Sequence, residues 1–263
     1  VTAGVASLLG FVIAPATGAE VASADDTARF LAGLSPSAGS PLTALTQERG
    51  WQQHANAMDK AFAQIETRQI SRIRAWGSVN LASPQPTVFY MFSGPDFLYA
   101  NAFFPKASTY VLSGLEPTGP IPDLQTQRGS IASTLASLQN STRTLFDYSF
   151  FITRNMKDHL AQQGTLPILY VFLARSGKRI RDVGFVNIDG QGEAMADSGP
   201  KAKSAARGVK IDFADADGRL QTLYYFSTDL ANSGLKRSGF LAFCEKLGAG
   251  DTFLKSASYL MHK

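Results

Sequence analysis

Apolar side chains recur at helical spacing through residues 46–76, the longest periodic stretch of the chain. Intervals of three and four residues place them on one face of an α-helix. We therefore predict a long helix that lies on a core and bends near Thr67. His54 falls off this apolar face, and we predict that it lies at the surface. The residues of the apolar face are Trp51, Ala55, Met58, Phe62 and Ile65.

Shorter apolar and aromatic runs, separated by Gly, Pro and Asp, are typical of β-strands. The run LPILYVFLA at 166–174 is apolar throughout, which favours a strand covered on both faces. The Ser-Gly-Lys that follows it predicts a hairpin turn into the next strand, and Asp217-Gly218 predicts another hairpin. The predicted strands are residues 87–92, 109–115, 166–174, 179–188, 208–213 and 219–227.

Helices are predicted between and after these strands. Asp25 or Asp26 can cap the first of them, and Ser93 can cap the second. Two helices with a join near 140–144 are expected within 127–163, and a polar surface loop within 194–207. The other predicted helices are residues 27–34, 96–104, 239–247 and 251–263, the last capped by Asp251.

This mixture predicts an α+β (mixed α/β) fold, formed by residues 25–263 as a single globular domain. We expect a central, mostly antiparallel or mixed sheet of about five to seven strands, flanked by helices.

The first 24 residues have the pattern of a signal peptide. The apolar run at 5–16 is too short to span a bilayer, and Ala22-Ser23-Ala24 offers a cleavage site, with Thr17-Gly18-Ala19 as a second candidate. We therefore expect a periplasmic or secreted bacterial-type protein; a buried element of the fold is the alternative. No other stretch reaches membrane-spanning length. Since the chain starts with Val and ends inside a helical pattern, we expect the full protein to continue beyond both ends.

Composition is that of an ordinary globular protein, with 44% hydrophobic and 17% charged residues. The net charge of +4 is spread along the chain, and the two basic groups, at 175–181 and 201–210, flank turns that we expect to be solvated. Nucleic acid is therefore not an expected partner. The single cysteine, Cys244, excludes an intramolecular disulfide and is predicted to be buried and unreactive.

Known catalytic and cofactor-binding motifs are missing. The chain has no G-x-S-x-G, G-x-G-x-x-G, phosphate-binding loop or H-E-x-x-H pattern. Its three histidines lack the spacing of metal ligands. Asp215 and Asp217 resemble part of a calcium loop, but Tyr224 stands where that loop requires Glu. We expect no metal and no cofactor.

Two aromatic strands resemble each other in sequence. Residues 87–92 are followed by Ser93 and Asp96, and residues 222–226 are followed by Ser227 and Asp229. Ligands bind beyond the carboxyl ends of strands in sheets covered by helices. If the two strands are parallel neighbours, these side chains converge at one edge; otherwise they are ordinary turn and cap residues. The candidate ligand-binding residues are Ser93, Asp96, Tyr99, Asn101, Glu116, Asp123, Ser227 and Asp229.

Three functions are compatible with these patterns. The first is an exported, non-enzymatic protein that binds a small molecule or an envelope partner at the loop face 93–123. The second is a hydrolase of an envelope or extracellular substrate that uses carboxylates such as Asp96 and Glu116. The third is a structural envelope component, for which the aromatic residues within 89–104 should be fully buried and no pocket should be present.

Overall fold

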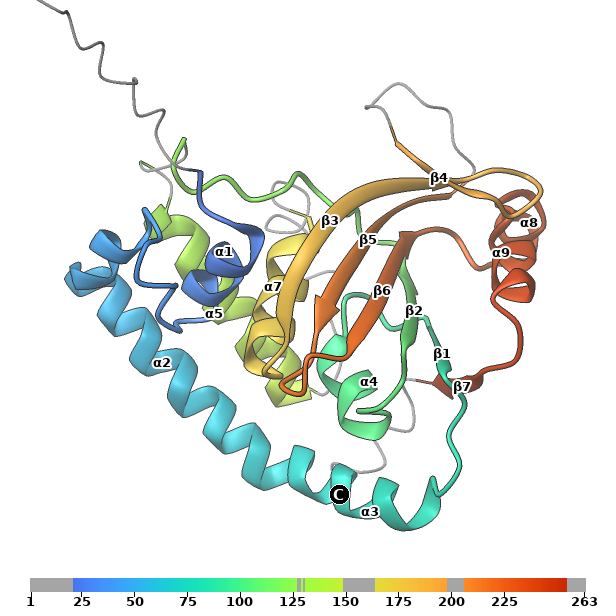
Figure 1. Ribbon diagram of the computed structural model, residues 1–263, viewed down its shortest axis with the longest axis horizontal. Helices are drawn as coiled ribbons and strands as arrows, with labels where there is room; N and C mark the ends of the chain where they lie inside the picture. The colour runs from blue at the N-terminus through green and yellow to red at the C-terminus, as the bar shows by residue number, and fades with distance from the viewer. Residues whose placement is uncertain (1–20, 127–128, 130, 149–163, 198–205, 255–263) are drawn as a thin grey trace, which may run out of the picture.

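A seven-stranded mixed sheet with helices on both faces forms the protein (Figure 1). The computed structural model describes residues 21–126, 129, 131–148, 164–197 and 206–254. The strand order is β4-β3-β5-β6-β2-β1-β7. The predicted α+β class and mixed sheet are confirmed. The strands are β1 (Thr87–Met91), β2 (Thr109–Gly114), β3 (Arg179–Ile188), β4 (Ala194–Ala196), β5 (Ala206–Ala214), β6 (Leu220–Ser227) and β7 (Asp251–Leu254).

One half of the sheet is parallel and the other is antiparallel. The neighbouring strands β7, β1, β2 and β6 all run in the same direction. Strands β5, β3 and β4 then alternate in direction, and β5–β6 is the hairpin that Asp217-Gly218 predicts. The Asp215 carboxylate ties this turn by accepting from the amides of Asp217 and Arg219, at 3.0 and 2.9 Å.

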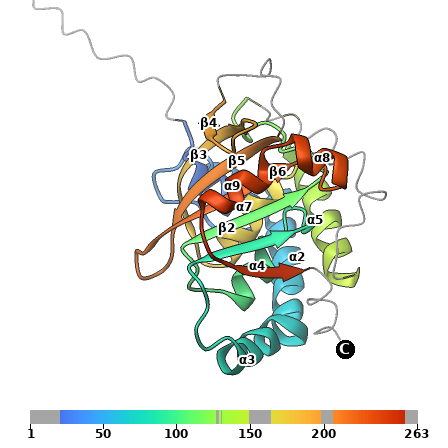
Figure 2. The same ribbon diagram turned by 90° about the vertical axis from the view of Figure 1, so that its right-hand side faces the viewer.

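The two faces of the sheet are covered unequally. Figure 2 shows α8 (Asn232–Arg237) and α9 (Phe240–Lys246) on one side of the sheet. The other side carries α2 (Arg49–Ile65), α4 (Phe97–Phe103), α5 (Ile131–Tyr148) and α7 (Leu166–Arg175). The α8–α9 side has a small apolar cluster around Phe226 and Phe240, whereas the opposite side holds the main core. The helices of the main core also include α1 (Ala24–Leu31) and α3 (Ser71–Asn80).

The long helix predicted at 46–76 is confirmed, and its helical type changes around Thr67, where a bend was predicted. A 3-10 turn (Thr43–Gln47) precedes α2, and a π-helix (Glu66–Ile70) that contains Thr67 joins α2 directly to α3. Trp51, Met58 and Ile65 are buried on the predicted face.

The prediction of a strand at 166–174 was wrong, because these residues form the helix α7. All nine are buried, since α7 is enclosed by α1, α4, α5 and β3. A helix buried on every side is apolar all round, so its sequence resembles that of a buried strand. Pro167 points to the helix: proline fits the first helical turn, whereas in a central strand it would remove a ladder hydrogen bond.

Both ends of the described chain differ from the predicted helices. The first helix begins at Ala24, not at 27, and its cap is Ser23, whose hydroxyl accepts from the Asp26 amide at 3.0 Å. The Asp26 carboxylate accepts instead from the Ser37 amide at 2.7 Å. Near the other end, residues 251–254 form strand β7 beside β1, and the Asp251 carboxylate accepts from the Gln85 amide at 2.7 Å. Long-range pairing has overridden a local helical pattern.

Other predictions fall partly outside the described residues. The helix α5 continues through 140–144, where a join between two helices was predicted. The prediction of a second helix falls mostly on 149–163, outside the described residues. The predicted loop 194–207 contains β4 and the start of β5. Residues 1–20 are not described, so the signal peptide stays a prediction. Within the described part of the chain, no helix is long and apolar enough to cross a bilayer.

Candidate functional site

The two similar aromatic strands, β1 and β6, flank β2 and run parallel to it. Their registers with β2 align Thr87 with Thr222 across Thr109, and Tyr90 with Tyr225 across Leu112. The sequence similarity between the two strands is therefore a structural equivalence, residue by residue. Their carboxyl ends, and that of β2, lie at the same edge of the sheet.

The chain leaves the adjacent parallel strands β2 and β6 toward opposite faces. The loop after β2 meets the start of α7, where the amides of Thr165 and Leu166 donate to the carbonyls of Pro117 and Thr118, at 2.9 and 3.0 Å. The loop after β6 leads to α8 and α9 on the other face (Figure 2). Such a divergence marks the place where ligands bind in open α/β sheets. We call this edge, built by residues 92–94, 113–116 and 225–228, the rim.

Glu116 is the carboxylate of the rim. The hydroxyl of Tyr225 donates to the Glu116 backbone carbonyl at 2.8 Å and lies 3.4 Å from its Oε2. The carboxylate folds over Gly114, where an added Cβ would lie only 2.4 Å from Oε2. Burial, and then the negative charge of Glu116, raise the pKa of Tyr225 well above its ordinary value. Because Tyr225 stays protonated, it remains a donor to Glu116.

Strand β1 carries an equivalent pair. The hydroxyl of Tyr90 donates to Asp96 Oδ2 at 3.0 Å, and Asp96 Oδ1 accepts from the Tyr99 amide as the cap of α4. Asp96 has no exposed surface. The similarity between the strands thus ends in two tyrosine–carboxylate pairs, and not in the two serine–aspartate pairs that the sequence suggested.

The other candidate residues divide into three groups, of which the first two lie at or after the carboxyl ends of strands. Ser93 and Ser227 lie at the rim with Glu116. Ser93 is buried and donates to the Gly94 carbonyl at 2.8 Å, and half-buried Ser227 lies 3.4 Å from the Leu115 carbonyl. Asp123 and Asp229 are exposed and accept from amides of their own loops. These two carboxylates therefore serve their turns.

Two candidates belong to helix α4 under the rim. Tyr99 is fully buried, and its hydroxyl is hydrogen-bonded to Gln69 of the π-helix. Asn101 is half-buried, and its Oδ1 has no hydrogen-bond partner among the described residues.

Phe92 is a rim residue that the sequence did not single out. It directly follows β1, is 64% exposed, and has a φ of 56°, the one left-handed conformation of a non-glycine residue in the described part of the chain. Leu115, directly after β2, is 71% exposed. The two exposed apolar side chains therefore follow neighbouring strands at the same edge. A run of strand-type residues gives no signal for a left-handed final residue.

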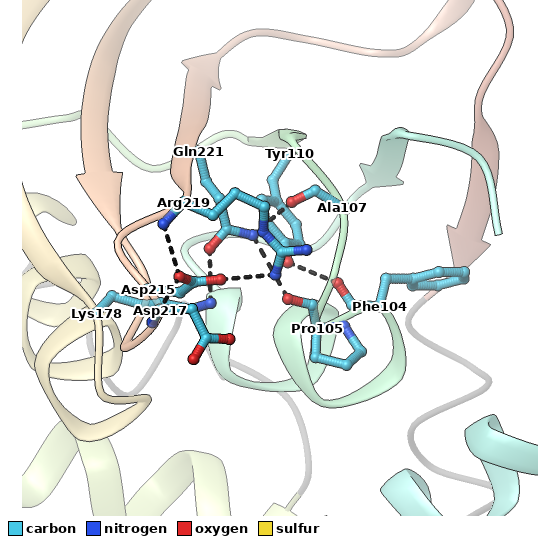
Figure 3. Close-up of polar contacts among 9 residues, drawn as sticks. All are labelled: Phe104, Pro105, Ala107, Tyr110, Lys178, Asp215, Asp217, Arg219 and Gln221. Atoms are coloured by element: carbon cyan, nitrogen blue, oxygen red, sulfur yellow. Dashed lines mark hydrogen bonds and ion pairs between the residues drawn. The ribbon is translucent and has the colours of Figure 1, made fainter.

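A second polar cluster lies at the opposite edge, at the amino ends of β2 and β6 (Figure 3). Lys178 donates to the Gln221 side chain at 2.7 Å, and Gln221 donates to the Ala107 carbonyl at 2.5 Å. Tyr110 donates to the Phe104 carbonyl at 2.6 Å. These bonds tie the turn after α7 to β6 and to the turn before β2, so the cluster is a structural clamp.

Lys178 and Arg175 were predicted to lie in a solvated loop, and this was wrong. Lys178 is 7% exposed, with its ammonium 5.8 Å from the centre of the Phe213 ring. Burial lowers the pKa of Lys178, while the nearby Asp215 carboxylate opposes this shift. The Arg175 side chain is 9% exposed and donates to Asp59 and to the Ala32 carbonyl. Both turn inward because the end of α7 is packed against α1 and β3.

His54 was also predicted to be exposed, and it is buried at 1%. It lies three residues after Trp51 and four before Met58, so it shares the apolar face of α2. Its Nε2 donates to the Leu31 carbonyl at 2.8 Å, and its Nδ1 accepts from Gln139 of α5 at 2.9 Å. Burial lowers the pKa of His54. The imidazole is thus a neutral link between two helices.

Cys244 is half-buried in α9, and burial raises the pKa of its thiol to about 12, which makes it a poor nucleophile. In the described residues, no group of three or more His, Cys, Asp and Glu side chains could hold a metal ion. Comparisons with models of protein families, with curated proteins and with solved structures found no match to this chain.

Proposed function

We propose that this is an exported, non-enzymatic binding protein that holds a small molecule or a group of an envelope partner at the rim. The observation that carries the proposal is Phe92, a strained and exposed aromatic residue directly after β1, at the same edge of the sheet where the connections after β2 and β6 diverge. The apolar segment at 5–16 supports the exported location.

The conformation of Phe92 is costly without a ligand. A left-handed backbone costs an L-residue roughly 1–2 kcal/mol, and glycine is the usual residue at such a position. The side chain gains little from burial, since 64% of it is exposed. Strained residues of this kind are concentrated at ligand-binding sites, where the strain presents a side chain.

The side chains of the rim indicate the class of ligand. Phe92 and Leu115 offer apolar surface, while Ser227 and Glu116 offer a hydroxyl and a carboxylate. A sugar, an amine or a peptide group combines an apolar face with donors that can reach such oxygens. We therefore propose a small sugar or peptide of the cell envelope as the ligand.

The two alternative functions have less support. A hydrolase that uses Asp96 and Glu116 needs both carboxylates to reach substrate, but Asp96 is fully buried and caps its own helix, α4. A structural component should bury its aromatic residues within 89–104. Phe89, Tyr90, Phe97, Tyr99, Phe103 and Phe104 are buried, but Phe92 is not.

A thermal-shift screen against sugars, amines and cell-wall peptides tests the proposal, with Phe92→Gly as the test variant. We expect this variant to be as stable as the wild type, or more stable by up to about 1 kcal/mol, because glycine relieves the left-handed strain. We expect it to lose the thermal shift that a ligand produces in the wild type.

The matched control is Leu220→Ala, which removes a side chain that is 71% exposed at the amino end of β6, the opposite edge of the sheet. This variant should respond to the ligand as the wild type does. A Phe92→Gly protein with an unchanged ligand response would refute the role of the rim.

A further inference from the structure

Helices α2 and α5 contact each other on the side of the molecule away from α8 and α9 (Figures 1 and 2). Two cavities are lined by residues of both helices. Their volumes are about 410 and 430 Å³, within the usual range for small-molecule sites. Gln139 lines both of them, so the two cavities adjoin at this residue, and we call them together the groove. Alanines on both helices keep the groove open: Ala57 and Ala61 on α2, and Ala132 and Ala136 on α5.

The first cavity is positively charged. Its described lining includes Lys60, Arg68 and Arg143 and no acidic residue. All three cations are exposed, and none of them forms an ion pair with another residue that the structure describes. Three like charges around one cavity repel each other, and a bound anion would relieve this repulsion.

The floor of the first cavity is apolar. Met58, Ile65 and Phe146 are buried beneath the cations. Thr142, also in the wall, is 2% exposed, and its hydroxyl has no partner among the described residues. The cavity thus combines a cationic mouth with an apolar base, which suits a molecule that has an anionic head and an aliphatic body.

The second cavity continues the apolar surface. Phe30, Trp51 and Leu135 lie in its wall, with the neutral His54–Gln139 pair at its base. Trp51 is nine residues before Lys60, or about 14 Å along the helix axis. Glu48 is the acidic residue of the described lining and lies at the end remote from the cations. An anionic head is therefore favoured at the first cavity, and a tail at the second.

We propose that the groove between α2 and α5 binds a single-chain amphipathic anion, with a carboxylate or phosphate head at Lys60, Arg68 and Arg143 and a linear aliphatic tail that runs past Gln139 toward Trp51. This site is separate from the rim, and the proposal does not depend on the function proposed there.

Isothermal titration of the whole chain with monomeric dodecanoate tests the proposal. We expect one dodecanoate to bind per chain and acetate not to bind, because the tail supplies most of the affinity. The double variant Arg68→Gln/Arg143→Gln should bind dodecanoate at least about tenfold more weakly. Arg72→Gln is the matched control, since Arg72 is an exposed cation of α3 that does not line the groove, and its affinity should be unchanged.

A second variant tests the position of the tail. Ala136→Trp fills the second cavity from an exposed position of α5, and it should weaken dodecanoate binding by a similar factor while the melting temperature stays near that of the wild type. Phe92→Gly should bind dodecanoate normally. The proposal is overturned if dodecanoate does not bind, or if the protein binds anionic vesicles but not monomeric dodecanoate. It is also overturned if a neutral dodecyl amphiphile binds as tightly as dodecanoate to both the wild type and the Arg68→Gln/Arg143→Gln variant.

Discussion

At the scale of single residues, the imidazole of His54 has a hydrogen bond on each ring nitrogen and almost no contact with solvent. Its two partners fix the neutral tautomer, because Nε2 donates to Leu31 and Nδ1 accepts from the Gln139 amide. Protonation would place a charge in the main core and remove the Gln139 bond. The positive charge of Arg175 disfavours protonation further.

We expect the free energy of unfolding to fall on acidification through His54. Its folded pKa lies below the ordinary value of 6.5, so the unfolded chain binds a proton first, and stability is lost as the pH falls below 6.5. For each pH unit below 6.5 over which His54 stays neutral in the folded state, the free energy of unfolding falls by up to about 1.4 kcal/mol.

The measurement is urea unfolding of the wild type and of His54→Gln, which keeps an N–H donor for Leu31, between pH 7.5 and 5. The wild type should lose stability relative to the variant as the pH falls. Parallel stability curves would contradict this account of His54.

At the scale of elements, helix α7 is fixed by glycines at both of its ends. Gly164 before it has a φ of 69°, and Gly177 after it has a φ of 71°. Their surroundings differ: an added Cβ at Gly164 would lie 2.2 Å from the Gly119 nitrogen, whereas Gly177 has no atom within 4 Å. At the start of α7, Gly164 is therefore packed against the loop that follows β2. At its end, Gly177 has room for a side chain, and only its left-handed backbone conformation disfavours one.

We expect Gly177→Ala to cost about 1 kcal/mol, the usual cost of a left-handed alanine. Gly164→Ala should cost at least about 2 kcal/mol more, because its new methyl group must displace the backbone at Gly119. Chemical denaturation of both variants measures the difference, and equal losses would show that the loop moves freely.

Most elements with a local signal could be predicted from the sequence. The long helix and the Asp217-Gly218 hairpin follow from periodicity and turn chemistry. The condition that β1 and β6 are parallel neighbours is met only in part: the two strands run parallel, but β2 lies between them.

What could not be predicted depends on tertiary environment. The run at 166–174 is a helix because other elements surround it, and residues 251–254 form a strand because β1 offers a free edge. At the rim, the sequence named Glu116 and Ser227 but missed Phe92. It could not show that Asp96 caps its own helix in a sealed interior, since a cap and a ligand-binding carboxylate look alike in sequence.

At the scale of the whole molecule, the sheet separates a large apolar core from a small one. The small core is Phe226, Phe240, Phe243 and a few neighbours beneath two short helices. Regions that bury less apolar surface open at lower free energy than the rest of a fold. The α8–α9 layer should therefore open without disturbing the main core.

We expect the amides of α7 to exchange hydrogen only through global unfolding and those of α9 to exchange faster. Phe240→Ala should accelerate hydrogen exchange in α8 and α9. In α7, the same variant should reduce amide protection by no more than its loss in the global free energy of unfolding. Hydrogen exchange followed by mass spectrometry measures both. Equal protection of α7 and α9 in the wild type would mean that the two layers unfold as one unit.

The π-helix Glu66–Ile70 has one further consequence for the shape of the protein. Its wider turn holds one residue more than an α-helical turn, which advances the following side chains by about 100° around the axis. The continuous helix can thus contact α5 with one face of its α2 segment and α4 with a different face of its α3 segment. A chain shortened by one residue here would form a regular α-helix, but Ile73 and Gly77 would then rotate away from their neighbours. The π-helical turn is therefore what allows one continuous helix to pack against two parts of the core.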